Sequence, residues 1–362
     1  MISRLYICLL LLIVLSSCDF FRPKAEESKE QITFNNPILS DATKPWAVFH
    51  EGFYYYMHGM DDKIVLWKTK DITDLKNALH KVIWTPKDPS RAHHIWGPEI
   101  HFINGKWYVY FEADDGNTDN HQVYVIENSS KDPFEREFVF KGHISTDKDN
   151  NWAIHPNVLK LKSGLYMTWS GWQSRRVEVE HQCIYIAKMK NPWTLDSERV
   201  LLSKPEFEWE RQWINPDGSK TAYTIYVNES PQFFQSKFHD KVYIYYSASG
   251  WWTSFYALGQ LTADANSDLL DPKSWVKSKR PAFKQSQENN VYSTGNCSFI
   301  SSPDNTEYFL LYSARKIECE AVGAADSRTL RLQRIEWSED GSPYFGVPVP
   351  EDVCLDKPSG ID

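Results

Sequence analysis

From about residue 35 onward, apolar and polar residues alternate along the chain with a period of two, and the helical spacing of apolar residues is nearly absent. Many of the alternating segments are rich in Tyr, Trp and Phe. Tight turns made of Gly, Asn, Asp or Ser join them in pairs, as at Asn104-Gly105 and Asp304-Asn305. Paired strands with such turns are typical of β-hairpins. The pattern therefore predicts an all-β protein.

The hairpins recur within a longer unit, in which a short polar motif precedes two strands and a hydrophilic loop. Five copies begin about 53 to 75 residues apart, at Lys44, Gly97, Ala153, Asn228 and Thr294. A strand-only repeat of this length is typical of a four-stranded propeller blade. We predict a five-bladed β-propeller over residues 35–350, with a β-sandwich as the alternative. The innermost strand of each blade starts near the central axis, so the five polar motifs are expected to meet in one funnel.

The first eighteen residues have the pattern of an export signal: one Arg near the start, an apolar run of about ten residues, and the ending Leu-Ser-Ser-Cys. The apolar run is shorter than the roughly 20 residues that a membrane-spanning helix needs. The ending resembles a bacterial lipobox, which predicts a signal peptide over 1–17, then lipidated Cys18 and a polar tether over 18–34. We expect a lipid-anchored protein of the bacterial cell envelope, on its periplasmic or outer face, with a short tail over 351–362. A secreted protein with an incidental cysteine is the alternative.

Composition excludes several classes of protein. The chain has 362 residues, a formal charge of −8 and 15% aromatic residues. The aromatic content excludes a disordered chain, and the negative charge makes a nucleic-acid partner improbable. Neither of the glycine-rich phosphate-binding motifs occurs. We expect the mature protein to contact the membrane only through the lipid on Cys18.

Cysteine and histidine spacing predicts no metal site or cofactor. Apart from Cys8 and Cys18, the cysteines are Cys183, Cys297, Cys319 and Cys354, and none lies in a CxxC pair. They could pair in three ways in an exported protein, but we favour buried free thiols. The histidines at 93, 94, 101 and 121 also lack a spacing that would require a metal.

Several segments carry a resemblance to a known family. They include WGPEIH from Trp96, TWSGW from Thr168, NESP from Asn228 and YYSASG from Tyr245. In these segments the chain resembles the family 43 glycoside hydrolases. The resemblance implies a five-bladed propeller and an exo-acting enzyme that removes arabinofuranosyl or xylosyl units from plant polysaccharides with inversion. The expected partner is an oligosaccharide or polysaccharide.

The catalytic motifs of the family are only partly present. Inverting hydrolysis needs an acid and a base whose carboxyl groups are roughly 6.5–9.5 Å apart. The resemblance assigns the general acid to Glu229, in the motif that reads Asn-Glu-Gly-Pro in the family. The family's base lies in an Asp-Pro-Trp motif that here begins with Lys44, and its pKa-tuning carboxylate lies in an Ala-Ile-Asp motif that here ends in His155. A histidine of the last blade is replaced by Asn296.

Lys44 is not expected to act as the base. A lysine with a pKa near 10.4 would need a shift of about three pH units, or roughly 4 kcal/mol, to lose its proton near neutrality. Lys44 could instead donate to a sugar hydroxyl or bind a carboxylate, which would suit a uronic acid. Asp41, three residues earlier, and His155 are the candidate bases, and Asp114 and Asp115 are further candidates.

Aromatic and polar residues near these motifs are expected to contact the sugar. Of Trp46, Trp96, Trp169 and Trp172, most would be core residues, but Trp172 is the first choice for stacking on a sugar face. The expected substrate-binding set is Lys44, Trp46, Glu99, His155, Trp172, Asn296 and Arg331. Three functions follow: a lipid-anchored glycosidase, a propeller that binds glycan without hydrolysing it, or a protein-interaction scaffold.

Overall fold

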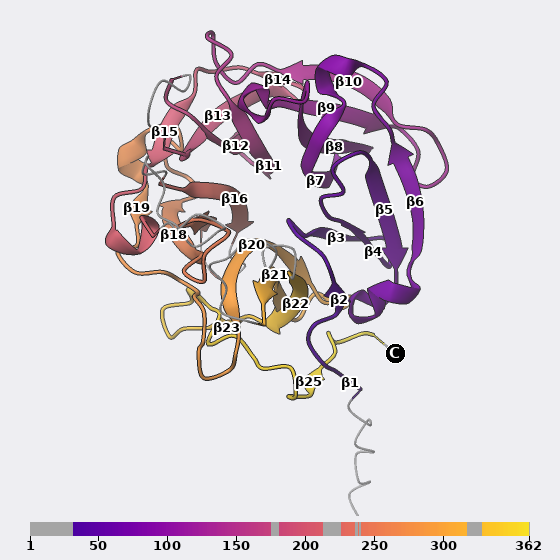
Figure 1. The fold of residues 1–362 in the computed structure, drawn as a ribbon, viewed down its shortest axis with the longest axis vertical. Coiled ribbons are helices and arrows are strands. Elements are labelled where there is room, and N and C mark those ends of the chain that lie inside the picture. The colour runs from indigo at the N-terminus through magenta and orange to yellow at the C-terminus, as the bar shows by residue number, and fades with distance from the viewer. Residues whose placement is uncertain are drawn as a thin grey trace, which may run out of the picture. The chain divides into compact units, whose positions relative to one another are not determined.

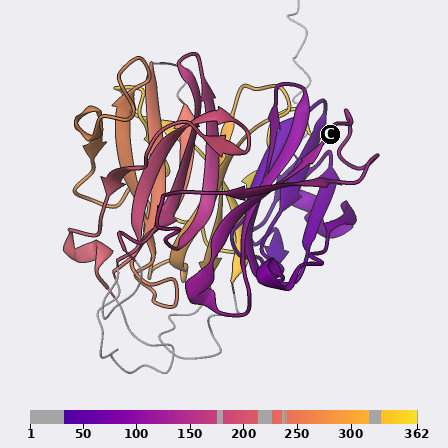
Figure 2. The same ribbon diagram turned by 90° about the horizontal axis from the view of Figure 1, so that it is seen from above.

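Five antiparallel sheets are arranged around one axis and form a five-bladed β-propeller (Figure 1). The computed structural model describes residues 32–174, 181–212, 226–235, 238, 240–316 and 328–361. Seen from the side, the strands run roughly along the axis (Figure 2). The all-β, five-bladed prediction is confirmed, and the β-sandwich alternative is wrong.

Each blade is built from strands that are consecutive in the sequence. The first contains β3 (Trp46–His50), β4 (Phe53–Met57), β5 (Ile64–Thr69) and β6 (Leu79–Trp84). The second contains β7 (His93–Ile103), β8 (Lys106–Asp114), β9 (Gln122–Asn128) and β10 (Val139–Ile144). The third contains β11 (Ala153–Leu161), β12 (Gly164–Gly171), β13 (Cys183–Asn191), β14 (Thr194–Leu195) and β15 (Val200–Ser203). The fourth contains β16 (Asn228–Gln235), β17 (Lys241–Ala248), β18 (Ala257–Asp264) and β19 (Val276–Lys277).

The fifth blade joins the two ends of the ring. It contains β20 (Tyr292–Ser301), β21 (Tyr308–Arg315) and β22 (Thr329–Arg334), and its outer strand is β2 (Leu39–Ser40) from the beginning of the propeller. Further out, β1 (Thr33–Phe34) pairs with β25 (Leu355–Asp356), so much of the segment from 351 onward is tied to the fold (Figure 1). A small hairpin of β23 (Glu336–Trp337) and β24 (Pro343–Tyr344) follows the fifth blade. The remaining elements are 3-10 turns: η1 (Ile72–Asn77), η2 (Pro89–Arg91), η3 (Thr118–Asn120), η4 (Glu208–Glu210) and η5 (Pro272–Ser274).

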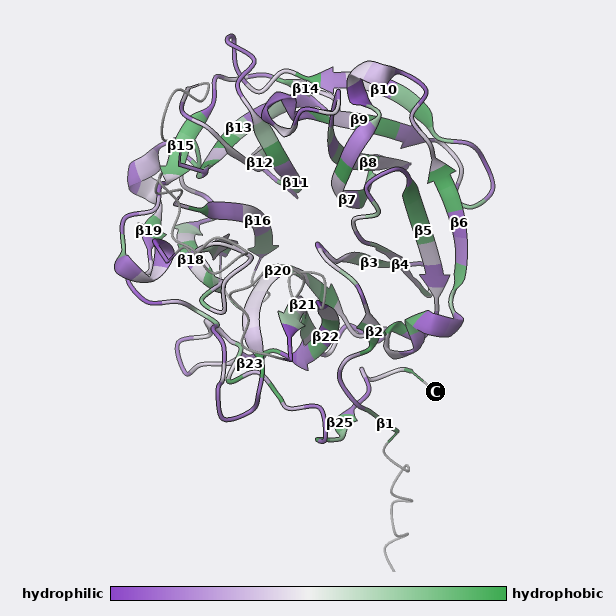
Figure 3. Cartoon of the chain, in the orientation of Figure 1, coloured by the Kyte–Doolittle hydropathy of each residue, from purple (hydrophilic) through white to green (hydrophobic). Residues whose placement is uncertain are grey.

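The core lies between neighbouring blades, because each sheet buries both faces against the next. Trp107 packs with Tyr55 between the first and second blades, and Trp169 packs in the cluster between the second and third. Hydrophobic residues are concentrated on the strands, whereas many connecting loops are hydrophilic (Figure 3). Burying a large apolar side chain contributes about 1.5–3 kcal/mol, so these layers account for much of the stability of the ring.

The innermost strands share a backbone distortion that directs side chains toward the axis. Each blade has a residue with positive φ either just before its inner strand, as at Lys44 (54°), or within the first five residues of it, as at Gly97 (44°), His155 (53°), Ser230 (50°) and Asn296 (48°). In four of the five blades the pairing register shifts at this point, as a β-bulge requires. Such conformations are costly for residues other than glycine and concentrate at functional sites.

Three of the cysteines can be described. Cys183 and Cys297 are buried free thiols and Cys354 is an exposed free thiol, while Cys319 lies outside the described residues. Within the described part of the chain, no helix has the length and apolar character needed to cross a bilayer. The predicted signal peptide and Cys18 also lie outside the described residues.

Candidate active site

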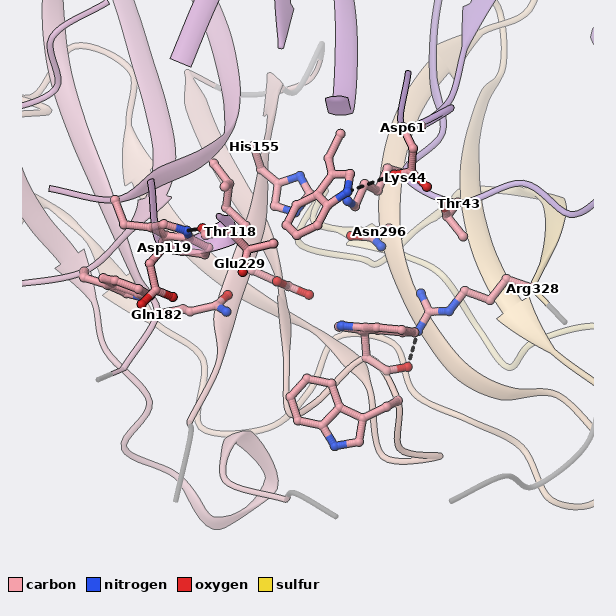
Figure 4. Close-up of a pocket in the computed structure, with 17 residues that line it drawn as sticks. Thr43, Lys44, Asp61, Thr118, Asp119, His155, Gln182, Glu229, Asn296 and Arg328 are labelled. Carbon is pink, nitrogen blue, oxygen red and sulfur yellow. Dashed lines mark hydrogen bonds between the residues drawn. The ribbon is translucent and has the colours of Figure 1, made fainter. Parts of the chain in front are cut away.

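A cavity of about 420 Å³ lies where the inner strands of the blades begin (Figure 4). All five blades contribute to its wall. Its polar side chains include Lys44, Asp61, Asp119, His155, Gln182, Glu229, Asn296 and Arg328, and its aromatic ones are Trp96, Trp152, Trp172, Trp251 and Trp252. The five polar motifs thus meet at one funnel, as the repeat predicts.

Five of the expected site residues line this cavity. They are Lys44, His155, Trp172, Glu229 and Asn296. The structure therefore brings together the proposed acid and both residues that stand where the family has carboxylates.

Three residues of the expected substrate-binding set do not line the cavity. Trp46 donates its indole N–H to the carbonyl of Ile100 at 2.7 Å. Glu99 is buried and accepts a hydrogen bond from Asn157 at 2.7 Å. Arg331 is buried and pairs with Glu351 at 2.9 Å. These contacts stabilise the fold, so the expectation that these residues bind substrate is corrected.

Three carboxylates considered as bases also lie elsewhere. Asp41 is exposed and does not line the cavity. Asp114 is fully buried, 2.9 Å from His94 and 3.0 Å from His121. Asp115 is exposed and accepts the backbone N–H of Asn117. Both are occupied in holding the loop after β8.

Glu229 has the environment of a general acid. Its side chain is 5% exposed, and one oxygen lies 2.6 Å from the hydroxyl of Tyr256. Burial raises the pKa of Glu229, while the Tyr256 hydrogen bond and the charges of Lys44 and Arg328 oppose that rise. Because a catalytic acid must hold its proton close to the working pH, a raised pKa suits this role.

Asn296 supports this carboxyl group through its neighbours. Its side-chain oxygen lies 2.9 Å from the Tyr256 hydroxyl and accepts the hydroxyl of Ser230 at 2.5 Å. A tyrosine hydroxyl has a single proton. When Glu229 is protonated, Tyr256 can therefore donate to Asn296 and accept from Glu229, and when Glu229 is ionised it can donate to Glu229.

Lys44 remains predominantly an ammonium near neutrality. Its Nζ lies 3.9 Å from the centroid of the Trp96 ring, a cation–π geometry. Burial lowers the pKa of Lys44 to about 8, against the opposing charges of Glu112, Glu229 and Asp61. With this pKa, most Lys44 side chains still carry a proton at pH 7.

Glu112, on β8, is a site residue that the sequence did not suggest. It is fully buried, and its Oε1 lies 3.4 Å from Nδ1 of His155. Burial raises the pKa of Glu112 to about 7, and the charge of Lys44 and the backbone N–H of His155 limit that rise. The sequence offered one signal for Glu112: it is an acidic residue within the aromatic strand that begins at Lys106.

Gly97 makes room for this arrangement. A Cβ at Gly97 would lie 2.8 Å from Nδ1 of His155 and 3.1 Å from Oε1 of Glu112. Its φ of 44° also favours glycine. Any side chain here would therefore push Glu112 and His155 apart.

His155 is neutral near pH 7. Burial lowers its pKa well below the usual value, and the charge of Lys44 adds to this effect. Its Nδ1 lies 3.4 Å from Oε1 of Glu112. His155 is therefore better suited to orienting its neighbours than to accepting a proton from water.

The aromatic wall can accommodate a sugar ring. Trp152 and Trp172 are stacked, with centroids 4.8 Å apart and planes inclined by 12°. On another part of the wall, Trp251 is 38% exposed, and its carbonyl accepts hydrogen bonds from Arg315 and Arg328. Apolar walls with a few fixed polar groups are typical of small-ligand sites. Within the part of the chain that the structure describes, no group of three or more His, Cys, Asp or Glu could hold a metal ion.

Fold and site together define a five-bladed propeller with the buried carboxyl group of Glu229 in a cavity lined by five tryptophans. The sequence profile described as "Glycosyl hydrolases family 43" matches residues 34–343. The chain belongs to this family.

Two curated relatives carry the same printed name. An "Extracellular exo-alpha-(1->5)-L-arabinofuranosidase" of Streptomyces avermitilis is 34% identical over 332 residues, which cover 89% of this chain and 65% of the relative. A protein of the same name from Streptomyces chartreusis is 31% identical, covering 80% of this chain and 84% of that one. The chain thus spans about two thirds of the length of the first of these relatives.

A solved structure agrees in fold and length. The crystal structure of an alpha-L-arabinofuranosidase from Lactobacillus brevis superposes with a TM-score of 0.78 at 30% identity. The match covers 88% of this chain and 98% of that one.

Proposed function

We propose that this protein is a glycoside hydrolase that removes terminal α-L-arabinofuranosyl units from plant-type polysaccharide side chains or their oligosaccharides, with inversion. The family and the names of the relatives support the substrate class. The observation that carries the proposal is Glu229: a carboxyl group with a raised pKa, hydrogen-bonded to Tyr256, in the wall of an aromatic cavity.

In this mechanism the Glu229 carboxyl group donates its proton to the leaving oxygen as the glycosidic bond breaks. Trp152 and Trp172 stack on each other and are largely buried, and they form an apolar part of the cavity wall. A cavity of about 420 Å³ suits one or two sugar units better than a long chain, which supports exo action. Lys44 and Arg328 add positive charge beside the reacting carboxyl group.

The test compares the wild type with Glu229→Gln on 4-nitrophenyl and 2,4-dinitrophenyl α-L-arabinofuranosides and on α-1,5-linked arabino-oligosaccharides. Removal of the acid should cost 10²–10⁴-fold on oligosaccharides, which have a poor leaving group. The loss should be much smaller on the dinitrophenyl substrate, which departs without protonation. The matched control is Glu339→Gln, an exposed residue remote from the cavity.

Two outcomes would contradict the proposal. One is a wild type that cleaves none of these substrates but binds arabino-oligosaccharides by calorimetry, which would identify a glycan-binding propeller. The other is Glu229→Gln that hydrolyses oligosaccharides at the wild-type rate.

We also propose that the protein is anchored to the bacterial envelope through a lipid on Cys18. The extracellular names of the relatives support export, and the signal-like first eighteen residues support the anchor. Mass spectrometry of the mature N terminus should find diacylglyceryl-modified Cys18. An unmodified N terminus at another residue would contradict the anchor.

A further inference from the structure

An inverting reaction requires a proton acceptor for the attacking water, on the face of the sugar opposite the acid. Lys44 lies over Trp96 and is predominantly an ammonium near neutrality, a form with no lone pair to offer. His155 faces Glu112, and Glu112 itself is closed off from the cavity. Among the described lining residues, the carboxylates other than Glu229 are Asp61 and Asp119.

Asp61 is held firmly in the loop between β4 and β5. Its backbone forms a two-way bridge with Ile95, with N···O distances of 3.2 and 2.9 Å. The indole N–H of Trp96 donates to Oδ1 of Asp61 at 3.0 Å. The same Trp96 ring carries the ammonium of Lys44 on its face. One indole therefore fixes both the carboxylate and the adjacent positive charge.

The position of Asp61 suits a water opposite Glu229. Figure 4 shows Asp61 beside Lys44 on one side of the cavity and Asp119 with Gln182 on the other, with Glu229 between them. Asp61 and Glu229 line the same cavity of about 420 Å³, and an inverting pair needs its carboxyl groups roughly 6.5–9.5 Å apart, with room for a water beside the sugar. Asp61 is exposed, so water can reach it.

We propose that Asp61 is the catalytic base, taking the place of the carboxylate that Lys44 replaces. This rests on the proposed glycosidase function. In the step, a water proton passes to Asp61 as the water oxygen bonds to the anomeric carbon. The bond from that carbon to the leaving oxygen breaks, and Glu229 protonates the leaving oxygen. Afterwards Asp61 returns its proton to solvent and Glu229 regains one, so protons and electrons balance.

Hydrolysis by Asp61→Asn and Asp61→Ala is measured on the dinitrophenyl substrate and on oligosaccharides, with and without sodium azide. Loss of the base should lower kcat at least 10²-fold on both substrates, because water must be activated whatever the leaving group. Glu229→Gln differs in this respect, because its loss of activity should be much smaller on the dinitrophenyl substrate. Azide needs no deprotonation, so with Asp61→Ala it should restore release of dinitrophenol and yield a glycosyl azide of inverted configuration.

Two further variants test the supporting contacts. Trp96→Phe keeps the ring but loses the N–H that holds Asp61, and it should lower kcat several-fold with less effect on KM. Asp119→Asn tests the other carboxylate. Thermal unfolding of each variant identifies any that fail to fold. If the Asp61 variants do not fold, Trp96→Phe tests Asp61 through a milder change.

The outcomes separate the two proposals. If the wild type hydrolyses neither substrate, the proposed function fails. If the wild type is active and Asp61→Asn stays within about threefold of it, Asp61 is not the base. If Asp119→Asn, and not Asp61→Asn, shows the loss on both substrates and azide rescue, the base lies on the opposite wall and this inference is overturned.

Discussion

The buried carboxyl group of Glu112 should destabilise the protein as the pH rises. Burial raises the pKa of Glu112 from 4.5 to about 7. The folded state then binds more proton than the unfolded state between these two values, so stability falls as the pH rises through this window. At 1.36 kcal/mol per pH unit, the total loss is about 3 kcal/mol. This is a large part of the 5–15 kcal/mol by which a folded domain is usually stable.

Glu112→Gln removes the ionisation while nearly preserving the shape of the side chain. We expect the variant and the wild type to have similar stability near pH 4.5. By pH 7.5 the variant should be more stable by about 3 kcal/mol. With about 2.1 cal/mol/K of unfolding entropy per residue and about 330 residues, this corresponds to a rise in Tm of about 4 °C.

The assay is thermal unfolding at half-unit steps from pH 4.5 to 8, with urea unfolding at the two extremes. Exposed Glu339→Gln serves as the control for the loss of one carboxylate. The difference between variant and wild type cancels the other titrating groups. A constant difference at all pH values would reflect packing alone and would refute the assignment of a buried titrating group at Glu112.

Three other changes test the remaining contacts. In urea unfolding, Gly97→Ala should destabilise the protein by about 1–3 kcal/mol more than Gly105→Ala. Both glycines have positive φ, but only at Gly97 would the added Cβ clash with neighbouring side chains. Equal losses would contradict the tight fit around Glu112. Tyr256→Phe removes a hydrogen bond that lowers the pKa of Glu229. The alkaline limb of the pH profile of kcat/KM should therefore move to higher pH. A limb that does not move would show that Tyr256 does not set the pKa of the catalytic acid. Because burial lowers the pKa of Lys44, the unfolded state binds more proton than the folded state between pH 8 and 10.5, and the stability of the wild type should rise by about 3 kcal/mol over this range. Lys44→Met should abolish this rise. A rise that persists in the pH–Tm curve of the variant would assign the effect to another group.

The fold was predictable because its determinants are local. Alternation places every second side chain of a strand on one face, and turns such as Asn104-Gly105 mark the hairpins directly. Repetition of that unit then defines the blade. Sequence also predicted that the polar motifs converge, because the inner strand of each blade must begin near the axis.

Which residues of each motif line the cavity was less predictable, because a motif does not show how far along the propeller axis each side chain lies. Glu99 follows Gly97 by two residues, which is about 6.6–6.8 Å along a strand. That is enough to take it from the cavity wall into the buried network with Asn157. Trp46 follows Lys44 by the same interval, and it packs on His101 and does not line the cavity.

Two residues important to the account had no motif to mark them. Glu112 resembles any residue of a strand until the positive φ of Gly97 and the position of His155 are known. Asp61 lies in a loop, and its place in the cavity wall and its contact with Trp96 identify it. Positive φ and β-bulges decide where such side chains point, and neither is encoded by alternation.

The most direct measurement is proton NMR of the sugar released by the wild type from an α-L-arabinofuranoside, recorded before mutarotation. A single displacement between Glu229 and a carboxylate across the cavity predicts that the β-anomer of arabinose appears first. Initial release of the α-anomer would require a covalent intermediate and would contradict a water-activating base opposite Glu229.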